Sequence, residues 1–406
     1  MAENRSKANI RNWWQALGPG LITAALVFGP SKMTITSKLG AEYGFSLLWI
    51  IVLAIFFMII FTSMAARIGM ATSESLLSSI RQKFGNTAAV AVGVGVFLVC
   101  TSFQAGNSIG VGIALGEMTG TPPKQWIMIF TLLGIGLLFF RTFYKVLEKI
   151  MILLIAIMLF AFITTFVLVK PQFSSIASGL VPGVPPGSLG LVIAFTASCV
   201  SIVGAFYQSY LVQERRRIRP EGPLSKNDSF TGIFILGIMS AIVLICAASV
   251  LQPNGIKVNS ATDMSKALVP LFGNYASALF LTGLFGAAFS SLIGNASVGG
   301  TLLGDAVGYG SQLNTKKVKY LIALVMVIGA IIAIVFGKLP LELIVFAQSV
   351  TIFIVPFIGI AMYLIANDEK LMGKLKNTPT NKFFAGLGLL VIIALAVVNV
   401  KDMFFK

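Results

Sequence analysis

Apolar runs of about twenty residues recur along the whole chain, and they restrict the folds open to it more than any other feature. A transmembrane α-helix needs roughly that many apolar residues to cross the hydrocarbon core of a bilayer. A membrane β-barrel would show short strands of alternating hydrophobicity, whereas the runs here are continuous. Charged residues make up 11% of the 406 positions, against about 25% in a typical soluble domain. The sequence therefore predicts an all-α membrane protein.

We predict eleven transmembrane helices from these runs. Their approximate ranges are 17–37, 45–68, 89–116, 126–141, 144–169, 188–213, 231–252, 277–303, 318–337, 340–366 and 383–402. We expect a single transmembrane domain over residues 1–406, with two five-helix repeats of opposite orientation over about 17–169 and 188–366, and an extra helix over 383–402. The repeats are inferred from the spacing of the spans, since the two halves show no obvious similarity residue by residue.

The basic residues lie between the apolar runs in short clusters, and the net charge is +16. Most of them fall in the N-terminal segment and in every second loop after it, including Arg67, Arg81 and the run from Arg215 to Arg217. Cytoplasmic loops carry such an excess of Lys and Arg. We therefore expect a cytoplasmic N-terminus and an external C-terminus, in the cytoplasmic membrane of a bacterium. The pattern argues against nucleic acid as a partner, and it indicates a lipid bilayer and a small solute or ion.

Two of the predicted spans carry features of an interrupted helix. Gly29-Pro30 lies in the middle of the first span, where proline removes a backbone donor and glycine relaxes the backbone. Gly204-Ala205 lies near the centre of the sixth span, among small and polar residues. Interrupted helices at corresponding positions of two repeats are typical of the central site of a transporter. For the first span, a plain proline kink is the alternative interpretation.

Several stretches of the chain resemble the Nramp family of proton-coupled divalent metal transporters, which have the LeuT fold. They extend over almost the full length: Leu17–Gly20, Gly40–Trp49, Met64–Thr72, Leu147–Lys149, Ser209–Gln213, Gly283–Gly294, Ala347–Val350, Pro356-Phe357 and Asp368–Gly373. No single stretch is specific, but together they are. The resemblance implies a LeuT-like fold of about eleven helices, with helices 1 and 6 interrupted, and secondary active transport of a metal ion.

The resemblance does not extend to the metal site. The first break of the family reads Asp-Pro-Gly-Asn, whose acid and amide are metal ligands, whereas this chain has Gly29-Pro30-Ser31-Lys32. The sixth-helix break of the family reads Met-Pro-His-Asn, with methionine as a soft ligand, and the matching stretch here is Ser201-Ile202-Val203-Gly204. Gln348 does match a helix-ten glutamine of the family's occluded site.

The residue types that bind metals and relay protons are scarce along the chain. It has no histidine, and its fourteen acidic residues fall in loops or near the ends of the predicted helices. Divalent cations need anionic or soft ligands, and proton relays in membranes use Asp, Glu or His. We therefore predict no metal ligands and no cofactor. An enzyme is the least favoured class, because no nucleophile–base set or phosphate loop is visible.

Lys32 lies inside the first predicted span. A charged lysine near the bilayer centre costs about 2.5–3.5 kcal/mol on insertion scales. Its positive charge would repel a divalent cation. Lys32 would then have one of two roles: it would attract an anionic solute, or it would replace a bound cation and titrate. Alternatively, its side chain extends to water or pairs with a backbone carbonyl, and it never meets substrate. The predicted substrate site comprises residues of the two breaks and one of helix ten: Gly29, Ser31, Lys32, Ser201, Val203, Gly204, Tyr207, Gln208 and Gln348.

Three functions are open from the sequence. The first is an Nramp-like secondary transporter with an altered substrate site, which we do not expect to take a transition metal. Its substrate would be a small solute, which could be an anion. The second is a divalent metal ion transporter (Mn²⁺ or Mg²⁺) of the inherited family type, with backbone carbonyls and amides as ligands. The third is a sensor or scaffold that kept the fold without transport. Among further polar residues of the spans, Gln104, Asn107 and Asn295 line a path or join helices.

Overall fold

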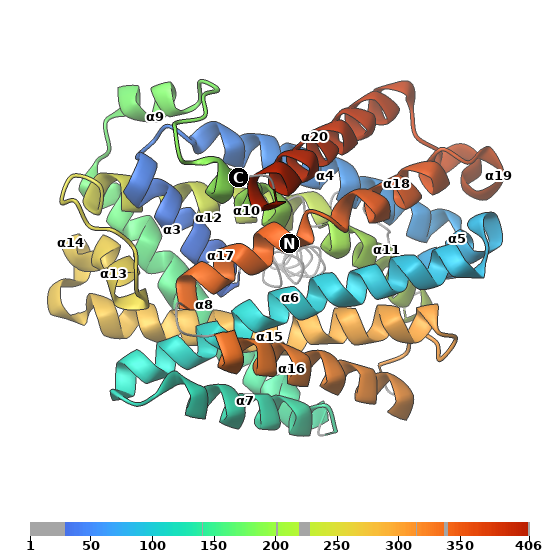
Figure 1. Ribbon diagram of the computed structural model, residues 1–406, viewed down its shortest axis with the longest axis horizontal. Coiled ribbons are helices and arrows are strands. Elements are labelled where there is room, and N and C mark those ends of the chain that lie inside the picture. The colour runs from blue at the N-terminus through green and yellow to red at the C-terminus, as the bar shows by residue number, and fades with distance from the viewer. Residues whose placement is uncertain are drawn as a thin grey trace, which may run out of the picture.

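The computed structural model describes residues 29–139, 141–199, 202–218, 228–313, 315–336 and 340–404. Within these ranges the chain forms helices joined by loops, with no β-strand (Figure 1). This result confirms the predicted all-α fold. In lipid every backbone N–H and C=O needs an internal partner, and a helix supplies those partners within one segment.

The longer helices lie close to the predicted spans. They are α3 (Pro30–Tyr43), α4 (Leu48–Ala71), α6 (Asn86–Thr119), α7 (Pro123–Leu137), α8 (Arg141–Val169), α10 (Leu189–Cys199), α11 (Ile202–Ile218), α12 (Asp228–Val250), α15 (Ala276–Ala306), α16 (Lys316–Phe336), α17 (Pro340–Thr351), α18 (Val355–Ala366) and α20 (Pro379–Phe404). Short helices occupy loops for which the sequence analysis predicted no structure: α5 (Leu76–Phe84), α9 (Phe173–Gly179), α13 (Ala261–Ser265), α14 (Val269–Phe272) and α19 (Glu369–Met372).

Seven helices of the described part are long and apolar enough to cross a membrane, and a bent pair formed by Ile155–Val169 and Phe173–Gly179 makes eight. The shorter apolar helices α7 and α18 fall at the predicted fourth and tenth spans. The remaining predicted span is the first, whose second half is α3 and whose residues 17–28 lie outside the described ranges.

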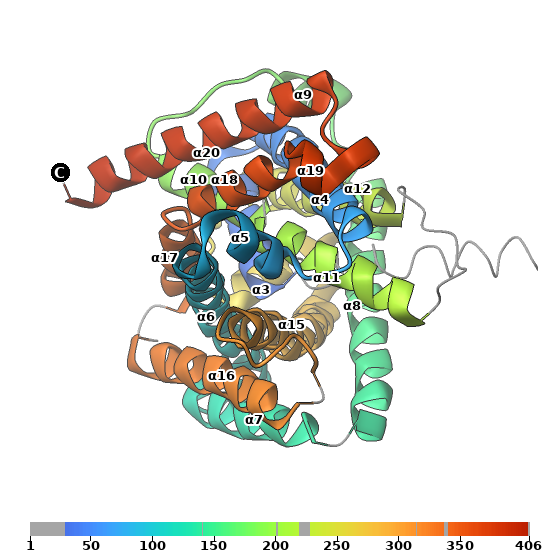
Figure 2. The same ribbon diagram turned by 90° about the vertical axis from the view of Figure 1, so that its right-hand side faces the viewer.

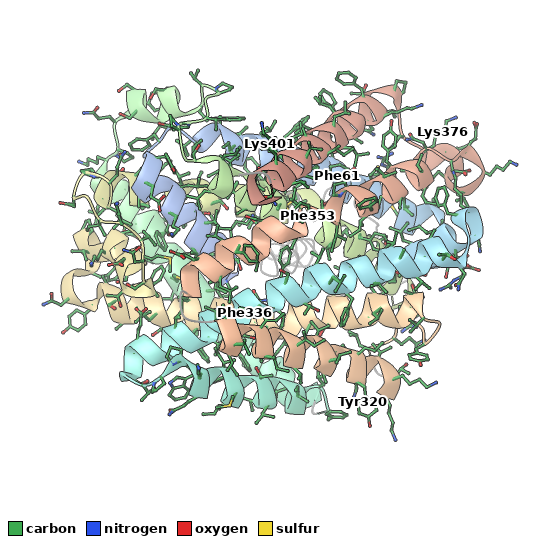
Figure 3. The ribbon with its side chains drawn as sticks, in the orientation of Figure 1. Phe61, Tyr320, Phe336, Phe353, Lys376 and Lys401 are labelled. Carbon is green, nitrogen blue, oxygen red and sulfur yellow. The ribbon has the colours of Figure 1, made fainter. Side chains whose placement is uncertain are left out.

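Two interruptions differ from the sequence prediction. The predicted single span over 340–366 consists of two helices, α17 and α18, with a turn at residues 352–354 between them. Figure 3 labels Phe353 in this turn. The cause is Pro356 in the first turn of α18, because proline cannot donate to the carbonyl of Ile352 and its ring crowds that carbonyl. In the sixth span, α11 runs through Gly204 and Ala205 without a break. The predicted position of that interruption at Gly204-Ala205 was therefore wrong. Residues 200–201, between α10 and α11, lie outside the described ranges.

Close backbone packing joins α3, α4, α11 and α12 into one set, which we call the α3 group. A Cβ added at Gly40 of α3 would overlap the backbone oxygen of Leu244 in α12. A Cβ added at Gly69 of α4 would lie 2.5 Å from the backbone oxygen of Ser209 in α11. Small residues let membrane helices approach closely, because association in lipid depends on van der Waals packing rather than on the hydrophobic effect.

Close packing at glycines also joins α6, α7, α15 and α16 into a second set, which we call the α6 group. A Cβ at Gly300 of α15 would lie 2.5 Å from the backbone nitrogen of Ile322 in α16, and one at Gly93 of α6 would overlap Ala306 of α15. A Cβ at Gly112 of α6 would lie 2.8 Å from the side chain of Ile127 in α7. The helices of each group are therefore fitted to one another at backbone level.

The two ends of the molecule carry different short helices. In Figure 1, α9, α13 and α14 lie at one end and α5 and α19 at the other. Figure 2 looks onto the second end, where α5 lies near α11 and α15. We call this the α5 end. Its basic residues include Arg81 and Lys83 of α5 and the exposed arginines of α11. The Lys83 ammonium hydrogen-bonds to Asp368, and this bond is the main reason why the pKa of the Asp368 carboxyl is lowered.

Large apolar and aromatic side chains cover the outer surface of the helices. On α16, Tyr320 and Phe336 are 66% and 64% exposed, and Figure 3 shows Tyr320 at the outer edge of the molecule. An exposed apolar surface of this extent is unfavourable in water but suits contact with lipid. The surface agrees with the composition in indicating a protein embedded in a bilayer.

The packing of α4 on α11 gives a first prediction. We expect Gly69→Ala to lower stability by about 1–3 kcal/mol, because the added methyl group meets backbone atoms of Ser209 that cannot move away alone. Gly136→Ala in α7 is the matched control, since nothing lies within 4 Å of the added Cβ, and it should be neutral or stabilising by up to about 1 kcal/mol. Thermal unfolding of the purified protein in detergent measures both. Equal melting temperatures for the two variants would contradict the packing described here.

Candidate functional site

The first turn of α3 coincides with the predicted interruption of the first span. Gly29 is the N-cap in an extended conformation, and Pro30 follows at the first helical position. Proline suits this position because its fixed φ is helical and its missing N–H would have had no intrahelical partner. The backbone N–H groups of Lys32 and Met33 donate to the carbonyl of Gly29 at 3.1 and 3.2 Å. The helix therefore begins inside the molecule, where its first turn faces other helices.

Lys32 lies in this first turn and is 1% exposed, so its side chain is enclosed by protein. Its Nζ lies over the ring of Phe195 in α10, 4.9 Å from the ring centroid. The face of an aromatic ring attracts a cation, and the attraction grows when both groups are desolvated. The carbonyl of Lys32 also accepts a hydrogen bond from Thr36 Oγ1 at 2.6 Å. This geometry contradicts the interpretation in which the lysine reaches out to water.

Helices α6 and α15 close over the other face of the turn. A Cβ added at Gly29 would lie 3.0 Å from Ser291 Oγ and 3.3 Å from Asn107 Oδ1. A Cβ added at Gly106 of α6 would lie 2.6 Å from Ser31 Oγ. Ser291 is 1% exposed, and its hydroxyl has no hydrogen-bond partner among the described residues. The side chains nearest to Gly29 are therefore polar, and they leave little room for a larger side chain.

Two polar residues of the spans serve mainly to join helices. Gln104 of α6 donates to the carbonyl of Leu292 at 2.9 Å, and Asn295 of α15 donates to Gln104 Oε1 at 3.1 Å and to the carbonyl of Cys100 at 2.7 Å. Such bonds hold membrane helices together. Asn107 differs, because its buried amide lies beside Gly29.

The predicted residues of the sixth span lie on α11, except Ser201, which falls outside the described residues. Val203 and Gln208 are buried, while Gly204 and Tyr207 are half-buried. The ring of Tyr207 stacks on that of Tyr210, with centroids 6.3 Å apart. Phe195 of the same predicted span was not predicted as a site residue, and its ring lies against Lys32.

Gln348 belongs to α17, but its side chain falls outside the described ones. The neighbouring carbonyl of Ala347 accepts a hydrogen bond from Ser102 Oγ of α6 at 2.8 Å. Helix α17 is thereby fixed to α6, close to the helices that surround Lys32. The role of Gln348 stays a prediction.

Metal-binding side chains do not gather in the described part of the chain. No group of three or more His, Cys, Asp or Glu residues lies close enough there to hold an ion. The neighbours of the first turn of α3 offer hydroxyl, amide and aromatic groups together with the ammonium of Lys32. Such a set can bind a hydrogen-bonding or anionic group more readily than a bare divalent cation.

Solved structures show which fold this arrangement of helices belongs to. A manganese transporter from Eremococcus coleocola matches with a TM-score of 0.77 at 20% identity, over 96% of this chain and 87% of that one. The nucleobase-cation-symport-1 family transporter Mhp1 matches with a TM-score of 0.58 at 14% identity, over 96% of this chain and 94% of that one. These likenesses show the fold, which is LeuT-like.

The family follows from the sequence comparison. The model described as "Natural resistance-associated macrophage protein-like" matches residues 20–402, and the chain belongs to this Nramp family. Its relatives include the divalent metal cation transporter MntH of Chromohalobacter salexigens, 25% identical over 97% of this chain and 92% of that protein. MntH of Bacillus subtilis is 25% identical over 96% of this chain and 92% of that protein. The chain is therefore an integral membrane transporter of the Nramp family.

A double-mutant cycle tests the contact between Lys32 and Phe195. We expect Phe195→Leu to destabilise the protein by about 0.5–2 kcal/mol more when residue 32 is lysine than in a Lys32→Met background, because the ring face attracts the ammonium. Thermal unfolding in detergent measures the difference. Phe280→Leu, at another fully buried phenylalanine, is the control and should show no coupling to residue 32. An equal loss of stability on Phe195→Leu in both backgrounds would rule out the attraction between the Lys32 ammonium and the Phe195 ring.

Proposed function

We propose that this chain is a secondary transporter with an altered substrate site, in which Lys32 attracts a small anionic solute such as a carboxylate. The observation that carries the proposal is the burial of Lys32 in the first turn of α3. The Nramp motif has a neutral amide at this position and an acid at the position of Gly29. Exchanging both residues removes one negative charge from the site and adds one positive charge.

Electrostatics favours this interpretation in two ways. A charge enclosed by helices is weakly screened, so an ammonium there repels a divalent cation and attracts an anion strongly. The N-terminal end of α3 carries the positive end of the helix dipole, which adds to the field of Lys32. Hydroxyl and amide groups of Ser291 and Asn107, next to Gly29, can accept or donate hydrogen bonds to a polar solute.

Divalent cation transport is the second candidate, and the comparisons support it better than they support a changed substrate. The family model covers most of the chain, and the relatives are named divalent metal cation transporters. A cation that keeps part of its hydration shell needs few direct ligands, and the oxygens of Asn107 and Ser291 are available to it. The buried ammonium in the same turn of α3 argues against this candidate.

We further propose that the protein lies in the cytoplasmic membrane of a bacterium, with its N-terminus in the cytoplasm and its C-terminus outside. The relatives named above are bacterial. The basic residues at the α5 end support the orientation, because Lys and Arg accumulate on the cytoplasmic side.

Uptake into proteoliposomes separates the two candidates. We expect uptake of one or more small carboxylates or amino acids from a panel, and no uptake of Mn²⁺ or Mg²⁺ above that of empty liposomes. Lys32→Ala should lower the solute uptake roughly 10-fold or more, because a hydrogen bond between charged groups is lost. Lys38→Ala is the matched control on the same helix, since Lys38 forms a partly exposed pair with Glu42 and such pairs contribute little.

The opposite outcome is equally defined. Saturable Mn²⁺ or Mg²⁺ uptake that Lys32→Ala leaves intact or increases would establish the inherited type of transport and refute the changed substrate. Absence of uptake for every solute and ion in the panel would favour a sensor or scaffold.

A further inference from the structure

A buried carboxylate lies at the α5 end, away from the first turn of α3. Asp305, in the last turn of α15, is 8% exposed, and among the described side chains it is the one buried acid. Tyr210 Oη of α11 donates a hydrogen bond to Asp305 Oδ2 at 2.6 Å. Tyr210 is itself 7% exposed. A short bond to a carboxylate in a low-dielectric setting belongs to the stronger class of hydrogen bonds.

Helix α5 covers this bond. The backbone N–H of Leu77 donates to Tyr210 Oη at 3.4 Å, while Arg81 Nη2 donates to the carbonyls of Asp305 and Ala306 at 3.2 and 2.9 Å. Arg81 also satisfies C-terminal carbonyls of α15 that have no intrahelical partner. The Tyr210–Asp305 pair is therefore enclosed, and a movement of α11 away from α15 would break its hydrogen bond.

The bond joins the two packed groups. Tyr210 belongs to the α3 group through α11, and Asp305 belongs to the α6 group through α15. In alternating access, one set of helices rocks against the other around a central site, so a path to either side opens only when the groups separate at that end. Close backbone packing within each group makes it move as a unit.

We propose that the Tyr210–Asp305 hydrogen bond is the latch that keeps the α5 end closed, and that it must break before the central site opens to that side. Helix α5 adds a second tie between the groups, because Leu77 bonds to Tyr210 of α11 and Arg81 bonds to backbone carbonyls at the end of α15. Two further ties at this end are of another kind. Gln213 and Arg216 of α11 bond to the end of α4 and its following loop, which belong with the α3 group. The Lys83–Asp368 pair is partly exposed, where water competes for both partners.

This inference goes beyond the proposed function, because it concerns the motion of the helices and holds for an anionic or a cationic cargo. Its test therefore uses no substrate. A negative result in this test would not bear on which solute is transported. An unexpected solute in the uptake assay would not bear on the Tyr210–Asp305 bond.

The test measures how fast a buried thiol at Thr301 is modified. Thr301 lies one turn before Asp305 on the same face of α15 and is 2% exposed. Thr301→Cys is introduced in a background in which Cys100, Cys199 and Cys246 are replaced by alanine. A charged, membrane-impermeant methanethiosulfonate is applied to sealed vesicles of each orientation. The modification rate is proportional to the open population even when that population is small.

We expect slow modification in the parent protein and a rate roughly 10-fold higher or more with Tyr210→Phe, since the bond to a charged group is lost. The increase should appear only when the reagent is on the α5 side. Asp305→Asn should act in the same direction. The double variant should be no faster than the faster single variant, because both remove one bond. Tyr363→Phe is the matched control, since its hydroxyl bonds to a carbonyl of Lys382 and should leave the rate unchanged.

Three results would overturn the latch. The first is a modification rate with Tyr210→Phe equal to that with Tyr363→Phe. The second is a double variant in which the rate increases of Tyr210→Phe and Asp305→Asn multiply. The third is fast modification already in the parent protein. If Tyr210→Phe fails to fold, Asp305→Asn alone decides the question, because it keeps the shape of the side chain and removes its charge.

Discussion

A helix that begins inside a membrane protein leaves the N–H groups of its first turn without intrahelical partners, and this constraint governs the centre of the molecule. Pro30 removes one such N–H, and the carbonyl of Gly29 accepts from two others. The polar side chains of Ser291 and Asn107 gather at the same turn from α15 and α6. The proposed substrate site lies at this turn because α3 begins at Pro30, after the extended Gly29.

Under the proposed function, the chain shares the helix packing of metal transporters but carries a different cargo, and physical chemistry explains how both can hold. Helix packing depends on small residues such as Gly69 and Gly300, which fit whichever ion or solute passes. Cargo selection depends on a few charges near the break. The helix packing can therefore be shared with relatives at about 25% identity while the charge near the break of the first span differs in sign. A fold does not fix a function.

The sequence predicted the fold well, because long apolar runs and the proline at position 30 are local signals. Pro356 is an equally local signal, and the break between α17 and α18 could have been predicted from it. The sixth span has no proline to mark a break, and the break predicted at Gly204 was wrong because α11 is helical there. Phe195 against Lys32, and Tyr210 against Asp305, could not be predicted. The second pair is 95 residues apart, and its meeting depends on how α11 and α15 pack.

Under the proposed function, Lys32 and the Tyr210–Asp305 latch have complementary tasks. A tethered ammonium attracts an anion without the entropic cost of recruiting a free cation, but it cannot leave with the cargo. Release must then come from a weaker attraction. When the groups separate at the α5 end, water enters and raises the local dielectric, which lowers the interaction between two unit charges several-fold. A latch that excludes water until the groups separate thus allows tight binding in the closed state and release in the open one.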